Sequence, residues 1–230
     1  MFMHGGGYYR GSIAATRATV ARISAEAKIK CLSIDYRLAP EHPFPAAIND
    51  TYSAYEWLVN EGINPEHIIV SGQSAGGGLC LALLLKIKDK NFSQPKGAVA
   101  LSPWTDLYQT GKTMVTNEKI DPIISKKYLD RFAKLYFPDS YNMSYLASPI
   151  IGELSGLPDI LIQVGSAETM LDDSKRFYKK AKKANVNVKL EIWEDMFHGW
   201  HSNAHILNDA DKAIKNIGIF CRNVLHKKTE

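Results

Sequence analysis

Cysteine is scarce in this sequence of 230 residues, since only Cys31, Cys80 and Cys221 are present and they lie far apart. Secreted scaffolds held by disulfides need cysteines in pairs, so this odd, scattered set argues against such a framework and predicts a reducing compartment. Only three residues precede His4, which leaves no room for a signal peptide before the glycines that follow it. We therefore expect a cytoplasmic protein.

Long hydrophobic runs and a strong net charge are also missing. The longest nearly unbroken apolar run covers residues 76–85, about half the length that a membrane crossing needs. The 28 Lys and Arg residues against 24 Asp and Glu residues leave a net charge of +4, too little to indicate a nucleic acid or a membrane surface as partner. We expect one globular domain without membrane insertion and without nucleic acid.

Motifs for metals and nucleotides are absent as well. The sequence has no H-E-x-x-H pattern, no closely spaced cysteine pair and no G-x-x-x-x-G-K-[ST] loop. His198, His201 and His205 are close in sequence, but their spacing matches no ordered metal motif. The sequence therefore predicts neither a metal nor another cofactor.

What the sequence does contain is an alternation of strand and helix patterns. Strands are predicted at residues 29–36, 67–71, 97–102, 159–165 and 188–193, and helices at 46–60, 72–88, 172–184 and 207–224. This order predicts an α/β fold with a mostly parallel sheet covered by helices on both faces. Residues 109–144 interrupt it with a polar stretch and an amphipathic helix at 125–137, which we interpret as a lid insert in a single domain, 1–230.

A possible nucleophile lies where a strand pattern changes into a helix pattern. Residues 72–76 read Gly-Gln-Ser-Ala-Gly and match G-x-S-x-G, in which the serine occupies a sharp turn with its hydroxyl raised above the sheet. The alternative is a glycine-rich turn that binds phosphate at the helix N-terminus. Residues 4–7, His-Gly-Gly-Gly, offer backbone N–H groups that a reacting carbonyl could approach closely. A glycine run at a chain terminus is otherwise more often a flexible tail.

A base and an acid to activate this serine can be assigned from the loops after later strands. His198 follows the strand that ends near Trp193, and parallel sheets present catalytic groups on such loops. For the acid we favour Glu168, three residues past a strand, over Asp172 and Asp173, which resemble N-cap residues of the next helix. The resulting chain order, serine, acid and histidine, is that of α/β-hydrolase triads.

The motifs taken together resemble those of the hormone-sensitive-lipase-like carboxylesterases, which have the α/β-hydrolase fold. The matching segments are residues 4–7, 35–46, 72–77, 102–106 and 197–199. The resemblance implies that Ser74 is the nucleophile, His198 the base and Glu168 the acid, with the N–H groups of Gly5, Gly6 and Ala75 as the oxyanion hole. The sequence departs from the family pattern at Gln73, where many relatives have Asp or Thr, and at Glu168, where most have Asp.

The same resemblance sets expectations for substrate and assembly. It implies a small-molecule ester with a short or medium acyl chain. From their places after the glycine loop and in the insert, we expect Tyr8, Tyr9 and residues between 108 and 137 to line the pocket. Relatives carry a segment before the His-Gly-Gly-Gly motif, so we expect the lid helices and first strands to be missing here, with the glycine loop held at one end. A bare sheet edge would favour a homodimer. The alternatives are an inactive truncated esterase and a non-catalytic ligand-binding relative such as the plant gibberellin receptors. The presence of His198 favours the enzyme.

Overall fold

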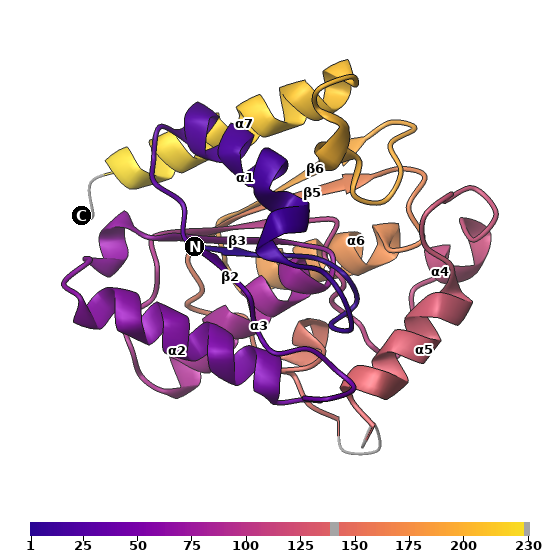
Figure 1. The fold of residues 1–230 in the computed structure, drawn as a ribbon, viewed down its shortest axis with the longest axis horizontal. Helices are drawn as coiled ribbons and strands as arrows, with labels where there is room; N and C mark the ends of the chain where they lie inside the picture. The colour runs from indigo at the N-terminus through magenta and orange to yellow at the C-terminus, as the bar shows by residue number, and fades with distance from the viewer. Residues whose placement is uncertain (139–142, 228–230) are drawn as a thin grey trace.

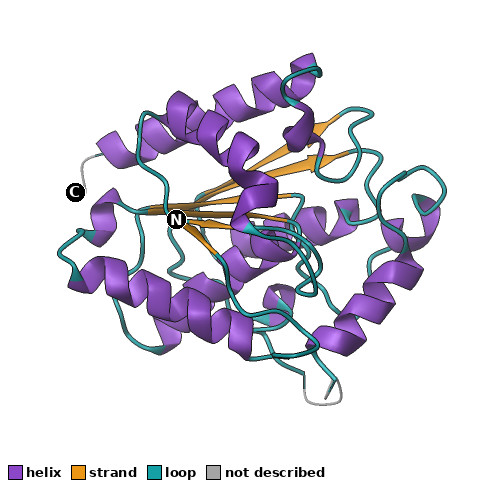
Figure 2. Cartoon of the chain, viewed as in Figure 1, coloured by secondary structure: helices purple, strands orange, loops and turns teal. Residues whose placement is uncertain are grey.

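The computed structural model describes residues 1–138 and 143–227, which form a parallel sheet between two layers of helices (Figures 1 and 2). Its strands are β1 (Phe2–Met3), β2 (Ser33–Ile34), β3 (Ile69–Gln73), β4 (Gly97–Leu101), β5 (Asp159–Gly165) and β6 (Val188–Trp193). Within the described residues these strands follow the order β2-β1-β3-β4-β5-β6, and every neighbouring pair is parallel. The α/β architecture predicted from the alternation is confirmed.

The helices lie on both faces of the sheet, as Figure 1 shows. They are α1 (Ile13–Ala27), α2 (Ala46–Asn60), α3 (Ala75–Asp89), α4 (Thr113–Thr116), α5 (Lys126–Tyr136), α6 (Leu171–Lys183) and α7 (Asn208–His226), with short 3-10 turns η1 (Pro65–His67), η2 (Pro149–Ile151) and η3 (Trp200–Asn203). Helices α1 and α7 pack side by side on one face, and α2, α3 and α6 cover the other. No helix among the described residues has the length and apolar character to cross a bilayer.

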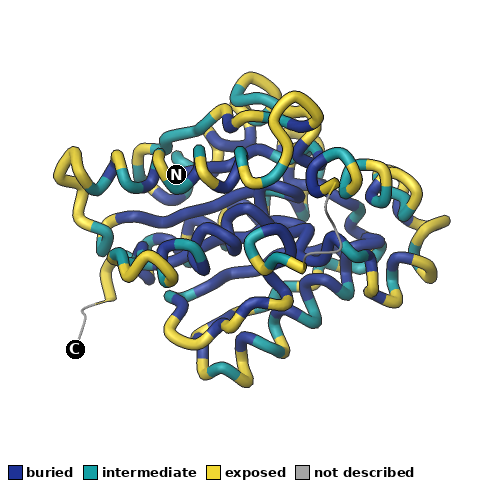
Figure 3. The backbone as a smooth tube through the Cα atoms, turned by 90° about the horizontal axis from the view of Figure 1, so that it is seen from below, coloured by how far each residue is buried: buried dark blue, intermediate teal, exposed yellow. Residues whose placement is uncertain are grey.

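Alternation along each strand explains the two layers. Successive side chains of a strand point to opposite faces, so Phe2 and Ile69 join the core under α1 and α7, whereas Met3 and Val70 join the core over α2 and α3. Strands with apolar residues on both faces are typical of parallel sheets covered by helices on both sides. Figure 3 shows the resulting buried backbone through the middle of the molecule and the exposed turns around it.

Two features near the N-terminus differ from the sequence prediction. The strand expected over residues 29–36 is reduced to Ser33–Ile34, and helix α1 was not predicted. Only Thr19, Val20, Ile23 and Ala27 of α1 are buried, while alanine, threonine and arginine fill most of its other positions. Its apolar stripe is therefore too narrow to stand out by periodicity alone. The helix is nevertheless placed by packing, since Val20 and Ile23 contribute to the core beneath α7.

The segment that we interpreted as an insert lies at one side of the sheet and carries α4 and α5 (Figure 1). The helix predicted at 125–137 corresponds to α5, which begins after Ser125, whose hydroxyl accepts a hydrogen bond from the Tyr128 N–H. Leu129 and Tyr136 of this helix are buried, and its lysines face outward. Residues 139–142 of the predicted insert lie outside the described residues.

Candidate active site

Ser74 occupies the turn between β3 and α3. Its backbone has φ 58° and ψ −121°, a conformation that costs a non-glycine residue energy and persists only where its surroundings impose it. The surroundings here are close: a Cβ atom on Gly76 would lie 2.2 Å from the carbonyl oxygen of Met3. Glycine at this position lets the start of α3 approach β1 closely, which holds the serine at the carboxyl end of β3.

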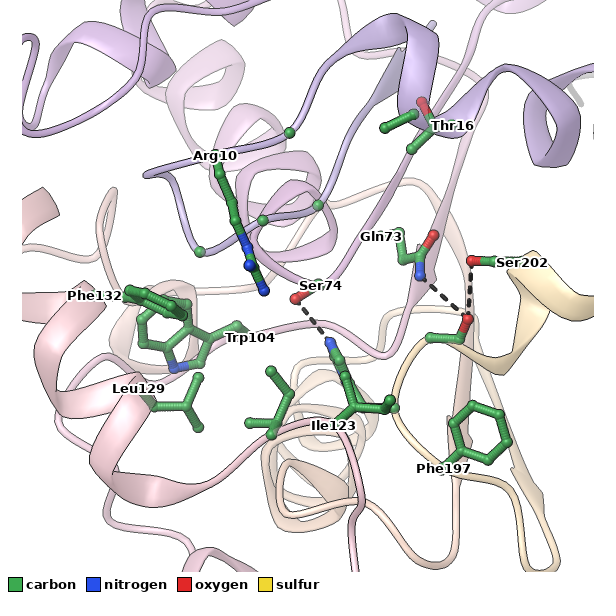
Figure 4. Close-up of a pocket in the computed structure, with 18 of the residues that line it drawn as sticks. Arg10, Thr16, Gln73, Ser74, Trp104, Ile123, Leu129, Phe132, Phe197 and Ser202 are labelled. Atoms are coloured by element: carbon green, nitrogen blue, oxygen red, sulfur yellow. Dashed lines mark hydrogen bonds between the residues drawn. The ribbon is translucent and has the colours of Figure 1, made fainter.

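His198 connects this serine to a buried carboxylate. Its Nε2 atom lies 2.9 Å from Ser74 Oγ, and its Nδ1 atom lies 2.9 Å from Glu168 Oε2. All three side chains are buried, although they come from three different loops at the carboxyl ends of β3, β5 and β6. The structure thus brings together the serine, histidine and acid chosen from the sequence. The dashed line from Ser74 in Figure 4 marks its hydrogen bond to the histidine.

The Glu168 carboxylate is held at its second oxygen as well. Oε1 accepts hydrogen bonds from Ser102 Oγ at 2.7 Å and from the Gly165 backbone N–H at 2.6 Å. Both donors stabilise the ionised carboxylate and fix its plane, so that Oε2 faces the imidazole. Sequence reasoning assigned no role to Ser102, although a signal was present, because this residue ends a predicted strand at the same sheet edge as Ser74 and belongs to a motif typical of the family.

Replacing Ser102 with alanine is expected to lower kcat about tenfold and to leave KM nearly unchanged. Loss of a hydrogen bond to a charged group costs about 1.5–3 kcal/mol, part of which the remaining Gly165 N–H recovers. Steady-state kinetics on a butyrate ester test this expectation. Ser148→Ala is the matched control, because Ser148 is equally buried but bonds to the Leu107 N–H away from the site. Equal kcat values for the two variants would contradict the positioning role.

Asp172 and Asp173 do not cap helix α6, which corrects the sequence interpretation. The helix begins after Met170, and no side chain caps it. Asp172 Oδ2 instead accepts a hydrogen bond from the Lys112 N–H at 2.8 Å. Asp173 Oδ2 accepts hydrogen bonds from the N–H groups of Thr105 and Asp106, each at 2.9 Å. Both carboxylates bind loops that follow β4, because the first turn of α6 lies against those loops. Neither contacts His198.

Asp173 makes folding stability depend on pH. Its burial, and then the nearby Asp106 carboxylate, raise the pKa of Asp173 from 3.8 to about 8, outweighing the two N–H donors that favour the charged form. The folded chain therefore keeps a proton that the unfolded chain releases above pH 3.8. This contribution to stability is complete below that pH and decreases as the pH rises toward 8.

Asp173→Asn is expected to flatten the dependence of unfolding free energy on pH between about 4 and 8. The variant has no carboxyl group to ionise at this position, so its stability should improve relative to the unmodified chain by up to about 1.4 kcal/mol for each pH unit in that range. Urea unfolding of both proteins at pH 5, 6, 7 and 8 measures the difference. Parallel curves would show that Asp173 is ionised throughout.

The glycine loop lies directly beside Ser74. A Cβ atom on Gly5 would be 3.1 Å from Ser74 Cβ. Gly6 has φ 124°, and a Cβ atom there would be 2.0 Å from the Arg10 carbonyl oxygen. Within the described part of the chain, neither Gly5 nor Gly6 donates its N–H to another residue. Ala75 provides the first N–H of helix α3, a position without an acceptor in its own helix. The Gly5 backbone and the start of α3 therefore lie next to the serine.

The glycine loop is held at both ends, contrary to the expectation of a loop held at one end. Before it, His4 is buried, stacks on the Tyr36 ring at 4.3 Å, and accepts a hydrogen bond from Tyr36 Oη at its carbonyl oxygen. After it, the Tyr8 carbonyl oxygen accepts a hydrogen bond from the Ala39 N–H at 2.8 Å. The loop gains this support because Tyr36 follows the neighbouring strand β2.

A cavity of about 320 Å³ opens above Ser74 and His198. The insert contributes its apolar wall, as predicted, through Ile123, Ile124, Leu129 and Phe132. The remaining lining comes from the glycine loop, the start of α1, Gln73, Trp104 and residues 197–199, 202 and 203, and it includes Arg10, Thr16, Phe197 and Ser202 (Figure 4).

Tyr8 and Tyr9 do not line this cavity, so that part of the prediction is wrong. Tyr8 has φ 62°, which turns its side chain into the core. There it is 1% exposed and stacks on Tyr136, with the ring centroids 3.7 Å apart. Tyr9 points outward and stacks on Phe132. Both tyrosines support the wall that the insert forms, since Phe132 lines the cavity and Tyr136 belongs to the same helix.

Known proteins share this sequence pattern and fold. The sequence matches the family model described as alpha/beta hydrolase fold over residues 1–202. The crystal structure of an esterase from the bacterial hormone-sensitive lipase (HSL) family is 42% identical to the chain, with a TM-score of 0.96, and the match covers 97% of this chain and 75% of that one. This chain belongs to the hormone-sensitive-lipase-like α/β hydrolases. The family and fold predicted from the motifs are confirmed.

Two other proteins are similar over nearly the whole chain. The acetyl-hydrolase of Streptomyces hygroscopicus is 37% identical over 222 residues, which are 96% of this chain and 74% of the acetyl-hydrolase. The crystal structure of EstE5, soaked with p-nitrophenyl butyrate, is 41% identical with a TM-score of 0.96, and the match covers 99% of this chain and 76% of that one.

In this hormone-sensitive-lipase-like hydrolase, the segment interpreted as an insert is bound to the loop that carries Glu168. Asn117 Nδ2 donates to the carbonyl oxygens of Ser166 and Glu168, each at 3.0 Å. Thr113 Oγ1 donates to the Thr169 carbonyl oxygen at 2.8 Å, and Asp121 Oδ2 accepts from the Thr169 N–H at 3.0 Å. Sequence reasoning missed these residues because short polar side chains in an irregular segment carry no periodic signal.

Two further side chains lie close to His198. Gln73 lines the cavity, and its Nε2 atom lies 3.5 Å from the Gly199 carbonyl oxygen, next to His198. His201 is fully buried, which, together with the nearby His198, lowers the pKa of His201 to about 3. Its Nε2 atom bonds to Gln163 Oε1 at 2.9 Å. His201 therefore serves as a neutral core side chain under the site. The described residues contain no group of three metal-ligating side chains.

Proposed function

We propose that this chain is a serine carboxylesterase that hydrolyses short- to medium-chain esters through an acyl-enzyme on Ser74. The observation that carries the proposal is the hydrogen-bonded series from Ser74 through His198 to Glu168, which opens onto a largely apolar cavity. The named relatives support it, since they include an acetyl-hydrolase and an esterase. A serine, a base and an acid in this geometry form a nucleophile that attacks carboxylic esters.

Acylation starts with proton transfer from Ser74 to His198. With Nδ1–H donating to Glu168, the Nε2 lone pair faces the serine hydroxyl and accepts its proton as Oγ attacks the ester carbonyl carbon. Negative charge then develops on the carbonyl oxygen, where the N–H groups of Gly5, Gly6 and Ala75 would stabilise it. One such donor is worth about 10²–10³ in rate. His198 then returns the proton to the leaving alcohol.

Deacylation repeats these steps with water in place of the alcohol. His198 Nε2 takes a proton from the water, whose oxygen attacks the acyl carbon on Ser74, and the serine oxygen leaves with that proton. Glu168 stays ionised and stabilises the imidazolium at both tetrahedral intermediates. The second oxygen of Glu168 is held by Ser102 and Gly165, so the histidine needs little reorientation between the two halves of the cycle.

The cavity favours short acyl chains. Its volume of about 320 Å³ is shared between the acyl and alcohol parts of the ester, which is at the small end of ligand sites. We expect a maximum of kcat/KM at acyl chains of about four to eight carbons, measured on a series of p-nitrophenyl esters. Titration with an organophosphate should give one active site per chain. A maximum on long-chain triglycerides would contradict this substrate range.

A non-catalytic ligand-binding role is the second candidate. It would need the same cavity but no aligned base, whereas His198 lies 2.9 Å from the serine oxygen. Turnover of p-nitrophenyl butyrate separates the two roles. A cytoplasmic location, suggested by three free cysteines, and a homodimer stay predictions. Cell fractionation and light scattering test them.

A further inference from the structure

Arg10 directs its charge into the cavity that holds Ser74. It follows the glycine loop, and its backbone N–H donates to the Gly6 carbonyl oxygen at 3.1 Å. This turn sends the side chain away from α1 and along the cavity, so that the guanidinium group lies toward Ser74 in Figure 4. Leu129, Phe132 and Trp104 line the same side of the cavity.

No carboxylate in the described part of the chain pairs with this charge. The residues that line the cavity include no Asp or Glu, and Arg10 forms no ion pair with any residue in the described ranges 1–138 and 143–227. A guanidinium group keeps its charge at every pH that proteins tolerate and has five N–H donors in a fixed fork. No side-chain carboxylate of the described residues uses these donors, and the guanidinium group faces the space that a substrate enters.

The segment beside the cavity increases the positive potential. Residues 109–137 contain six Lys and Arg residues against three Asp and Glu residues, so this stretch accounts for most of the chain's net charge of +4. The N-terminus of α3 adds a partial positive charge at Ser74. A cavity with a positive charge at its wall attracts ligands of the opposite sign.

We propose that Arg10 binds a carboxylate on the substrate, so that the preferred esters are anionic. This inference rests on the proposed esterase function and specifies its substrate class. Arginine pairs with carboxylates through two parallel N–H···O bonds, which fixes orientation as well as position. Because Arg10 and Ser74 line one small cavity, the carboxylate and the ester carbonyl are separated by only a few bonds. Monoesters of short dicarboxylic acids, and short acyl esters of hydroxy acids, have this spacing.

The test compares esters of equal length that differ in charge. p-Nitrophenyl hemisuccinate and p-nitrophenyl butyrate have acyl chains of the same number of carbons, and only the first ends in a carboxylate. We expect the ratio of their kcat/KM values to favour the hemisuccinate and to fall about tenfold in Arg10→Gln. Arg10→Lys should keep part of the preference, because it keeps the charge and loses the fork. Arg10→Glu should reverse it.

A second pair assigns the carboxylate to the acyl or the alcohol side. The butyrate ester of 4-hydroxybenzoate is compared with the butyrate ester of methyl 4-hydroxybenzoate, which is neutral. If Arg10→Gln changes the kcat/KM ratio of this second pair, Arg10 binds a carboxylate on the alcohol part of the ester. If it changes the ratio of the first pair, Arg10 binds a carboxylate on the acyl part. Arg17→Gln is the matched control, since it removes the same charge from an exposed position on α1 outside the cavity.

A binding measurement makes the result independent of turnover. Monomethyl succinate is titrated calorimetrically into Ser74→Ala and into the double variant Arg10→Gln/Ser74→Ala, with dimethyl succinate as the neutral ligand. A roughly tenfold weaker affinity for the anion alone in the double variant supports the proposal. Unchanged kinetic ratios in both pairs, or equal affinities, overturn it even if the butyrate ester is hydrolysed. Absence of all turnover with charge-selective binding overturns the esterase function and keeps the Arg10 site.

Discussion

Replacing Ser74 with alanine is expected to reduce the turnover of p-nitrophenyl butyrate by about 10⁴–10⁶-fold. The hydroxyl that His198 contacts is then missing, so no acyl-enzyme forms, and only the oxyanion donors and substrate binding remain. The fold should persist, because the strained backbone at this turn tolerates a small side chain. Single-turnover kinetics and intact-mass analysis after organophosphate treatment measure the two consequences, loss of rate and loss of one adduct.

The matched control for this variant is Ser71→Ala. Ser71 lies on the same strand and donates its hydroxyl to the Met1 carbonyl oxygen at 3.2 Å, away from the cavity. The Ser71→Ala variant should keep both its turnover and the single organophosphate adduct. Ser202 remains in the cavity of Ser74→Ala, so an adduct there, or full activity without Ser74, would disprove the assignment of the nucleophile.

Glu168→Gln is expected to lower kcat by about 10³–10⁴-fold. An amide at this position can present an N–H group to His198 Nδ1, which favours the tautomer that carries its proton on Nε2 and cannot accept one from Ser74. The hydrogen bonds from Ser102 and Gly165 to the other oxygen hold the side chain in place, so the loss is expected in kcat and not in folding. Steady-state kinetics together with thermal melting distinguish the two.

Asp172→Ala tests the alternative acid in the same experiment. Asp172 binds the Lys112 N–H and has no contact with the histidine, so its removal should change kcat less than about threefold while lowering the melting temperature slightly, through the loss of one hydrogen bond. The opposite ranking of the two variants, in folded protein, would transfer the role of the acid to Asp172.

The sequence predicted much of this architecture because several signals agreed. Strands β5 and β6 and helix α2 have the predicted bounds, since each is apolar in the right period and ends at a clear break. The serine, acid and histidine could be chosen because parallel strands present their carboxyl ends at one edge, where a motif and chain order selected one residue from each loop.

The missed features depend on contacts that no local pattern encodes. Helix α1 gains its place from packing against α7, and the direction of Tyr8 depends on a positive φ that the preceding glycines only permit. Asp173 resembled a helix cap because aspartate favours that position, but burial beside the loop after β4 gave it two other donors. Tertiary packing decided each of these cases.

The attachment of the insert to the acid loop has a consequence for evolution and for engineering of this chain. The segment whose Ile123 and Ile124 line the cavity also holds the backbone around Glu168, through Thr113, Asn117 and Asp121. Changes in this segment are therefore expected to alter substrate range and catalytic rate together. A library that randomises the whole segment will lose active members faster than it gains new specificities. A library that keeps the three polar anchors fixed and varies only the cavity-facing side chains should retain a larger share of working enzymes.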